Sequence, residues 1–252
     1  TLWREQLQHP ESNLGLWALR DLYARHPSLL AMNTHNVSGR ALAMSRDGGL
    51  AAVGDAGGRV TLWRLSDGAR LGEIAAAPKQ AWGAAMSANA ERLATIGDDG
   101  MLKLWSIADP EAPVLIRESL AHLRSGTAVA YSPDGSLIAT VGGDRSVGLF
   151  DGLTGVRTRT LIAPGAPGSR LLGVAFDDSG TRLAAGGEGP DVFLADLGSD
   201  IRTMEPFVQG NADIQTVSFS HDGKRLLAGT GGATQALYVW DIATRALLTK
   251  RP

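Results

Sequence analysis

His122 and Asp144 are the two residues of this chain whose types first suggest acid–base chemistry. In serine hydrolases a carboxylate orients a histidine, and the histidine then removes a proton from a nucleophile. A working dyad therefore needs a nucleophile or a third convergent group beside it. The sequence shows no such group accompanying these two residues, so we predict no catalytic residue here.

Motifs for phosphate, metal and nucleophile chemistry are also missing from the sequence. No lysine is followed by serine or threonine, which excludes a P-loop, and there is no GxSxG elbow. The Gly-rich segment 186–191 does not form GxGxxG ahead of a helix, and the acidic turns at 97–100 and 176–180 lack the ligand series of an EF-hand. We therefore predict no enzyme activity, no cofactor and no metal site.

The composition narrows the class of protein and its partners. The chain has 252 residues, enough for one large all-β domain or two average domains. Its net charge of −2 gives no basic surface for nucleic acid or an anionic membrane. It has no cysteine, which fits a reducing compartment, and no apolar run near the ~18 residues of a membrane span. We expect a cytoplasmic protein with a protein partner, without nucleic-acid or membrane partners.

Two sets of landmark residues repeat with nearly the same period. The first set precedes a turn: Met44, Met86, Tyr131, Phe176 and Phe219. The second set lies late in a later apolar run: Trp63, Trp105, Phe150, Ala195 and Trp240. The intervals are 42, 45, 45 and 43 residues in the first set and 42, 45, 45 and 45 in the second. The shared phase predicts five copies of one unit. The copies lie near 38–80, 81–125, 126–170, 171–213 and 214–252.

Each copy contains the same order of short segments. An alternating apolar run predicts a half-buried strand, and a tight turn follows it, written SPDG at 132–135 but SANAER at 87–92. A second run, another Gly/Asp turn, a third run and a weaker fourth run complete the copy. Four such strands form an antiparallel meander, and meanders stacked around an axis cover each other's faces. The sequence therefore predicts an all-β propeller of four-stranded blades.

The third run of the last copy ends in Val239-Trp240-Asp241, the closest match in this chain to the ending that marks WD repeats. With five phased copies across 38–252, the chain resembles the WD-repeat β-propeller family. The resemblance implies a non-catalytic scaffold or sensor for protein–protein interactions. The alternative is a propeller enzyme or a small-ligand-binding propeller that uses the mouth of the central channel.

The family resemblance also implies a buried polar network in a blade, made of a His, a Ser or Thr, an Asp and a Trp. The matching residues are His35 in the first copy, Thr95, Asp99 and Trp105 in the second, and His122, Thr140 and Asp144 in the third. Ala77 replaces the His in the second copy and Phe150 replaces the Trp in the third, so each of these sets is one member short. We interpret His122 and Asp144 as a structural pair.

The residues that enter the first strands of the blades are a mixed set. They are Arg40, Trp82, Thr127, Leu172 and Gln215. Because first strands line the channel of a propeller, we predict that these residues form the partner-binding face. Trp82 is the leading anchor, since a large aromatic often dominates the binding energy of an interface. The competing interpretation packs Trp82 against the neighbouring blade.

Residues 1–27 depart from the repeat, whereas 28–252 are predicted to form the propeller. Apolar residues on one face and a proline at position 27 predict a helix or linker. An alternative treats 14–17, LGLW, as another third strand, and 28–32 is predicted as a fourth strand. The run 18–45 resembles the junction before the WD-repeat sensor of bacterial STAND-type NTPases. We accordingly expect a fragment of a longer array within a larger bacterial signalling protein.

Overall fold

A computed structural model describes residues 39–166, 168–199, 202–209, 212–231 and 235–251. These residues form strands joined by turns and irregular loops, with no helix among them. The helix predicted within 1–27, the strand predicted at 28–32 and His35 lie outside the described residues. Nor do the described residues include a helix with the length and apolar character that crossing a bilayer requires.

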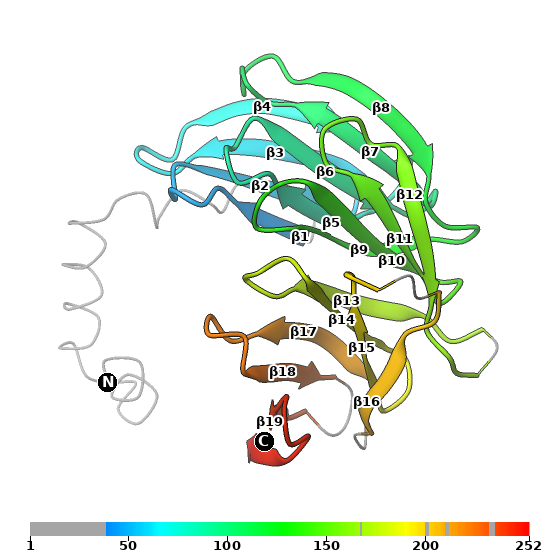
Figure 1. Ribbon diagram of the computed structural model, residues 1–252. Coiled ribbons are helices and arrows are strands. Elements are labelled where there is room, and N and C mark those ends of the chain that lie inside the picture. The colour runs from blue at the N-terminus through cyan, green and yellow to red at the C-terminus, as the bar shows by residue number, and fades with distance from the viewer. Residues whose placement is uncertain (1–38, 167, 200–201, 210–211, 232–234, 252) are drawn as a thin grey trace, which may run out of the picture.

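The described strands form five antiparallel sheets, each of four consecutive strands (Figure 1). The first blade holds β1 (Gly39–Met44), β2 (Leu50–Asp55), β3 (Arg59–Arg64) and β4 (Arg70–Ala75). The second holds β5 (Ala81–Met86), β6 (Arg92–Gly97), β7 (Met101–Ser106) and β8 (Val114–Leu120). The third holds β9 (Gly126–Tyr131), β10 (Leu137–Gly142), β11 (Ser146–Asp151) and β12 (Arg157–Ile162). The fourth holds β13 (Leu171–Phe176), β14 (Arg182–Gly187), β15 (Asp191–Asp196) and β16 (Glu205–Gln209). The fifth holds β17 (Ile214–Phe219), β18 (Arg225–Thr230), β19 (Leu237–Asp241) and β20 (Leu247–Arg251).

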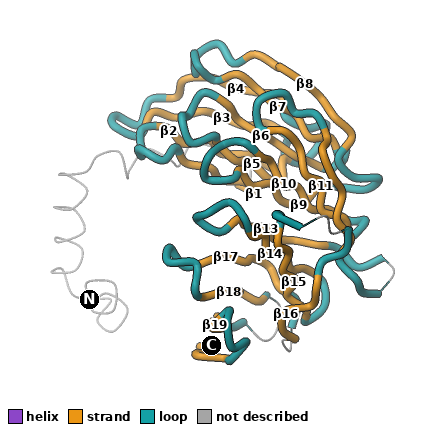
Figure 2. The backbone as a smooth tube through the Cα atoms, in the orientation of Figure 1, coloured by secondary structure: helices purple, strands orange, loops and turns teal. Residues whose placement is uncertain are grey.

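The blades follow one another around a common centre, with their first strands innermost (Figures 1 and 2). The inner strands pack in the order β1, β5, β9, β13 and β17. Within the described part of the chain, β1 and β17 are not among the strand pairs that pack extensively. The prediction of an all-β propeller with four-stranded blades is confirmed, and the first strands converge on one channel.

Adjacent blades pack face to face through apolar side chains. Ala43 and Leu62 of the first blade share a buried cluster with Met86 and Leu93 of the second. Both leucines are fully buried, and burying such a side chain contributes about 1.5–3 kcal/mol. Similar clusters join the later blades. The period-2 alternation seen in the sequence thus gives each blade two faces, and stacking buries them.

The turn after the first strand shows how the sequence ends one strand and starts the next. In the third blade the Ser132 hydroxyl donates to Asp134 at 2.6 Å and accepts the N–H of Leu137 at 2.9 Å. Gly135 completes the turn with φ of 73°, a conformation that glycine adopts without steric cost. In the second blade Ala90 takes the equivalent place with φ of 55°. The same turn therefore forms without glycine there, at the expense of backbone strain.

Candidate functional site

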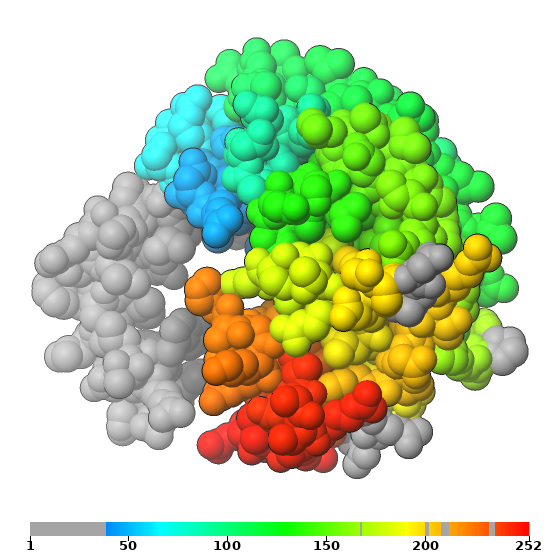
Figure 3. All heavy atoms as spheres, viewed as in Figure 1, coloured from blue at the N-terminus to red at the C-terminus, as the bar shows by residue number. Residues whose placement is uncertain are grey.

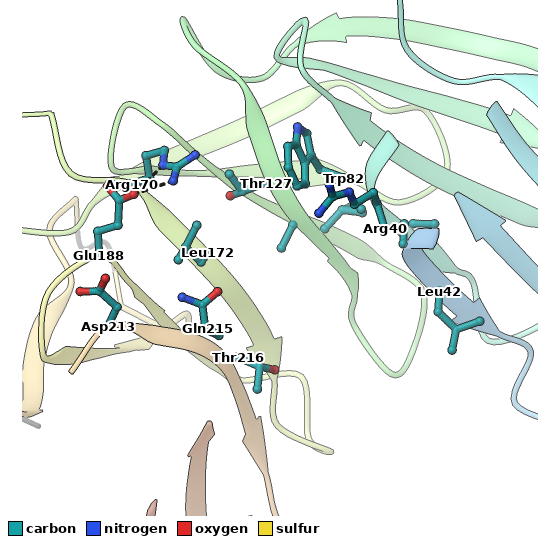
Figure 4. A pocket seen from close by; sticks show the side chains of 15 residues that line it. Arg40, Leu42, Trp82, Thr127, Arg170, Leu172, Glu188, Asp213, Gln215 and Thr216 are labelled. Carbon is teal, nitrogen blue, oxygen red and sulfur yellow. Dashed lines mark hydrogen bonds and ion pairs between the residues drawn. The ribbon is translucent and has the colours of Figure 1, made fainter. Parts of the chain in front are cut away.

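A pocket of about 620 Å³ opens where the first strands begin, at one end of the central channel. All five residues predicted for the partner face line it: Arg40, Trp82, Thr127, Leu172 and Gln215. Figure 3 shows the surface hollowed between the first blade and the fifth, and Figure 4 shows the lining side chains. One equivalent position from each of five blades thus meets at a single site, here called the channel mouth.

One side of the channel mouth is a cation resting on an aromatic ring. Arg40 enters the mouth from β1 and Trp82 from β5 of the next blade. The Arg40 guanidinium carbon lies 5.2 Å from the centre of the indole ring, within the range of a cation–π interaction. Arg40 is exposed and Trp82 is half-buried, so both retain surface that faces the pocket.

The opposite side of the channel mouth carries carboxylates from the fourth and fifth blades (Figure 4). Glu188 accepts the backbone N–H of Arg170 at 3.0 Å and its Nε at 2.8 Å, and Arg170 Nη2 lies 2.6 Å away. These hydrogen bonds from Arg170 hold the pKa of Glu188 below its usual value. Asp213 is exposed and accepts the N–H of Gly189 at 2.9 Å through Oδ1.

Sequence reasoning missed Arg170, Glu188 and Asp213 as lining residues. A positional signal exists, because Arg170 and Asp213 each stand one residue before an inner strand and Glu188 directly follows β14. The second blade uses the same loop geometry, where Asp98 accepts the N–H of Gln80 at 3.1 Å. Loop residues flanking the inner strands are therefore part of the mouth, together with the strand residues themselves.

Thr127 has a structural role at the mouth. Its hydroxyl lies 3.0 Å from the carbonyl oxygen of Val141 and 2.5 Å from that of Leu171. Val141 belongs to the same blade, whereas Leu171 begins the next inner strand. Since the hydroxyl has one proton to donate, Thr127 links the third blade to the fourth and offers less to a partner than Leu172 and Gln215 do. Leu172 is half-buried and Gln215 is exposed in the pocket.

His122 lies in a closed polar network away from the mouth, where it is only 2% exposed. Its Nδ1 lies 2.9 Å from Asp144 Oδ1 and 3.0 Å from the Ser146 hydroxyl. Its Nε2 lies 3.0 Å from the Thr140 hydroxyl. The carboxylate can only accept, so Nδ1 carries a proton. Both ring nitrogens are engaged within the blade, and Ser146 is a partner that the sequence pattern did not predict.

Asp144 is held ionised by the same network. Burial raises the pKa of this carboxyl, but hydrogen bonds from His122, Ser146 and the Ser146 backbone outweigh it and bring the pKa well below the usual value. Asp144 Oδ2 also accepts the N–H of Leu123 at 3.1 Å. The carboxylate is thus tied to three segments of the blade, an arrangement that serves cohesion and leaves no base facing an accessible substrate.

The second blade contains two separate parts of this pattern. The Trp105 indole N–H donates to the Thr95 hydroxyl at 3.0 Å. Asp99 accepts the N–H of Met101 at 3.1 Å and lies 3.5 Å from Lys103 Nζ. Ala77 stands where the histidine would bridge them. No cluster of His, Asp or Glu suited to a metal ion occurs within the described ranges.

Comparisons with known proteins agree with this architecture. The family model described as "WD domain, G-beta repeat" matches residues 115–151 and 201–241. Telomerase protein component 1 of Mus musculus is 31% identical over 185 residues, which cover 71% of this chain and 6% of that protein. WD repeat-containing protein VIP3 of Arabidopsis thaliana is 32% identical over 164 residues, covering 60% of this chain and 48% of that protein. The alignments thus span less than half the length of either relative.

Proposed function

The chain belongs to the WD-repeat β-propeller family, and on this premise we propose that it is a non-catalytic interaction module whose protein partner binds at the channel mouth. One observation carries the proposal: the entry position of every described first strand lines the same pocket, yet holds a different residue in each blade. A position that only built the repeat would favour one residue type. Variation at a shared, accessible position suits recognition.

The acid–base groups of the chain support a non-catalytic role. His122 and Asp144 are enclosed by hydrogen bonds within the third blade. At the mouth, Glu188 is bound by Arg170, which leaves Asp213 as an acid without a base or nucleophile near it among the lining residues. A second candidate function is small-ligand binding at the same mouth, supported by a pocket volume of about 620 Å³, within the usual range for such sites.

The wider setting of the module belongs to the same proposal. The relatives are longer than the segments that match this chain, which fits a module within a larger protein. The sequence of 18–45 resembles the linker before a WD-repeat sensor in bacterial signalling NTPases. On that basis the module acts as the sensor of a larger cytoplasmic signalling protein. Sequencing the complete gene tests this directly, since a chain without an adjoining signalling domain contradicts it.

Panning a library of random peptides displayed on phage against the purified chain tests binding at the mouth. Clones that bind there should lose most of their binding to Trp82→Ala, because the anchor and the platform under Arg40 are removed together. Leu153→Ala is the matched control, since Leu153 is an exposed apolar residue outside the mouth. Thermal unfolding checks that both variants fold. Clones that bind Trp82→Ala as well as the unmodified chain would refute the proposal.

A further inference from the structure

Two opposite charges at the channel mouth have no partner of opposite sign. Figure 4 shows Arg40 on one side of the pocket and Asp213 on the other, with Leu172 and Gln215 between them. Both charged residues are exposed. Their separation across the pocket gives the mouth a positive side and a negative side.

Arg40 is the free cation of the positive side. Its guanidinium lies over the Trp82 ring, and no carboxylate among the described residues pairs with it. The ring restricts where the guanidinium lies, so less freedom is lost when an acid binds. A guanidinium can hold a carboxylate through two parallel N–H donors. This side therefore suits an acidic side chain of a partner.

Asp213 is the free anion of the negative side. One of its oxygens accepts the Gly189 N–H, and no cation among the described residues pairs with the carboxylate. Glu188 nearby is already neutralised by Arg170. The three groups together leave one net negative charge, which suits a basic side chain. The half-buried Leu172 between the two sides suits an apolar one.

We infer that the mouth takes a short extended peptide segment of mixed charge, with an acidic residue at Arg40, a basic residue at Asp213 and an apolar residue between them. This inference rests on the proposed function, because it names the partner chemistry of the same site. Segments with two acidic or two basic ends are disfavoured, since one end then meets a like charge. The charges at both ends are exposed, so each contributes a modest factor of about three- to tenfold in Kd.

Synthetic peptides test the charge pattern. Four fluorescein-labelled types are compared, each with an Ala-Leu-Ala centre: Glu and Arg at the two ends, Glu at both ends, Arg at both ends, and Gln at both ends. Longer centres of five residues cover a wider charge separation. Fluorescence anisotropy gives each Kd at low and at high salt. The mixed-charge peptide should bind at least about fivefold more tightly than each of the others at low salt, and this advantage should shrink as salt screens the charges.

Charge reversals turn the test into a switch of specificity. Arg40→Glu makes both sides acidic, so the peptide with Arg at both ends should become the best ligand. Asp213→Arg should favour the peptide with Glu at both ends, and the double variant should again favour the mixed peptide in the opposite direction. A variant that merely damaged the fold would weaken all peptides together. Arg46→Glu, at the opposite end of the channel, is the matched control and should change no preference.

Any result in which the reversals leave the ranking of the peptides unchanged overturns the inference. So does the absence of binding by every peptide up to about 1 mM while phage clones still bind in a Trp82-dependent way. In that second case the proposed function stands and only the partner chemistry is wrong. If no clone depends on Trp82 either, both fail.

Discussion

The second and third blades are held together by different polar contacts at the same place in the fold. Ala77 and His122 each precede an inner strand, and their N–H groups bond the carbonyl oxygens of Gly58 and Gly100 at 3.0 Å in both cases. In the third blade the imidazole then bridges a threonine and an aspartate. In the second blade that bridge is missing, and Lys103 approaches the aspartate instead. The comparison indicates that this position serves satisfaction of buried polar groups and not chemistry.

A second position changes together with the first. A Cβ on Gly148 in the third blade would lie 2.8 Å from the Thr140 hydroxyl oxygen, so a side chain there would disturb the threonine that holds His122. The equivalent residue of the second blade is Lys103, whose amine lies 3.5 Å from Asp99 and 3.6 Å from Glu118. Histidine with glycine, and alanine with lysine, are therefore two ways to partner one aspartate.

Removing the imidazole should have the largest effect. His122→Ala leaves Asp144 and Thr140 without their shared partner in a buried place, which costs about 1–3 kcal/mol in the free energy of unfolding. Urea unfolding measures the loss. His221→Ala is the control, because His221 is 98% exposed in its side chain and its removal should change stability little. Equal stability of the two variants would contradict a cohesive role for His122.

Acid should weaken the third blade through Asp144. Its pKa is lower in the folded chain than the ordinary value of 3.8 that the unfolded chain approaches. A carboxyl with a depressed folded pKa stabilises the fold above its unfolded pKa, and this contribution is lost as pH falls through the folded pKa. Stability should therefore drop below about pH 4. Asp144→Asn should be less stable at neutral pH and lose less on acidification; parallel pH curves would show that Asp144 is not involved.

The first turn of the two blades provides a backbone counterpart to this comparison. Gly135→Ala should destabilise the third blade by about 1 kcal/mol, because its φ is 73° and a Cβ there meets no neighbouring atom, so only backbone strain changes. Ala90→Gly relieves strain at φ of 55° in the second blade and should stabilise it by about 0.5–1 kcal/mol. Denaturant midpoints of both variants check the opposite signs. Shifts in the same direction would contradict the equivalence of the two turns.

The blades were predictable from the sequence because their signals are local. Alternation along each run and an Asp/Gly turn after it determine strand and hairpin within a few residues. The phase of the repeat then identifies equivalent positions, which is why Arg40, Trp82 and Gln215 could be assigned to one end of the channel before any coordinates were known. A repeat converts spacing along the chain into position around an axis.

The remaining features of the site depend on packing between segments far apart in sequence. Glu188 and Asp213 belong to loops, and only the docking of the fourth blade against the fifth brings their side chains to the same corner of the pocket. Ser146 joins the His122 network because the turn at Asp144 folds its hydroxyl back, to donate to the carboxylate at 2.8 Å. Neither the periodicity nor the residue type specifies such contacts.

Completing the network of the second blade should have the smallest effect and tests the comparison most directly. Ala77→His introduces an imidazole next to Asp99 and Thr95, the two kinds of partner that His122 has. One new buried hydrogen bond contributes about 0.5–1.5 kcal/mol, and Lys103 offsets part of it because its side chain stands where the third blade has glycine. A double-mutant cycle of Ala77→His with Asp99→Ala, measured by urea unfolding, isolates the new interaction from general packing effects. A favourable coupling free energy is expected, and it should grow in the Lys103→Gly background. Zero coupling in both backgrounds would mean that the second blade lacks more than the histidine, and that the two blades are not variants of one network.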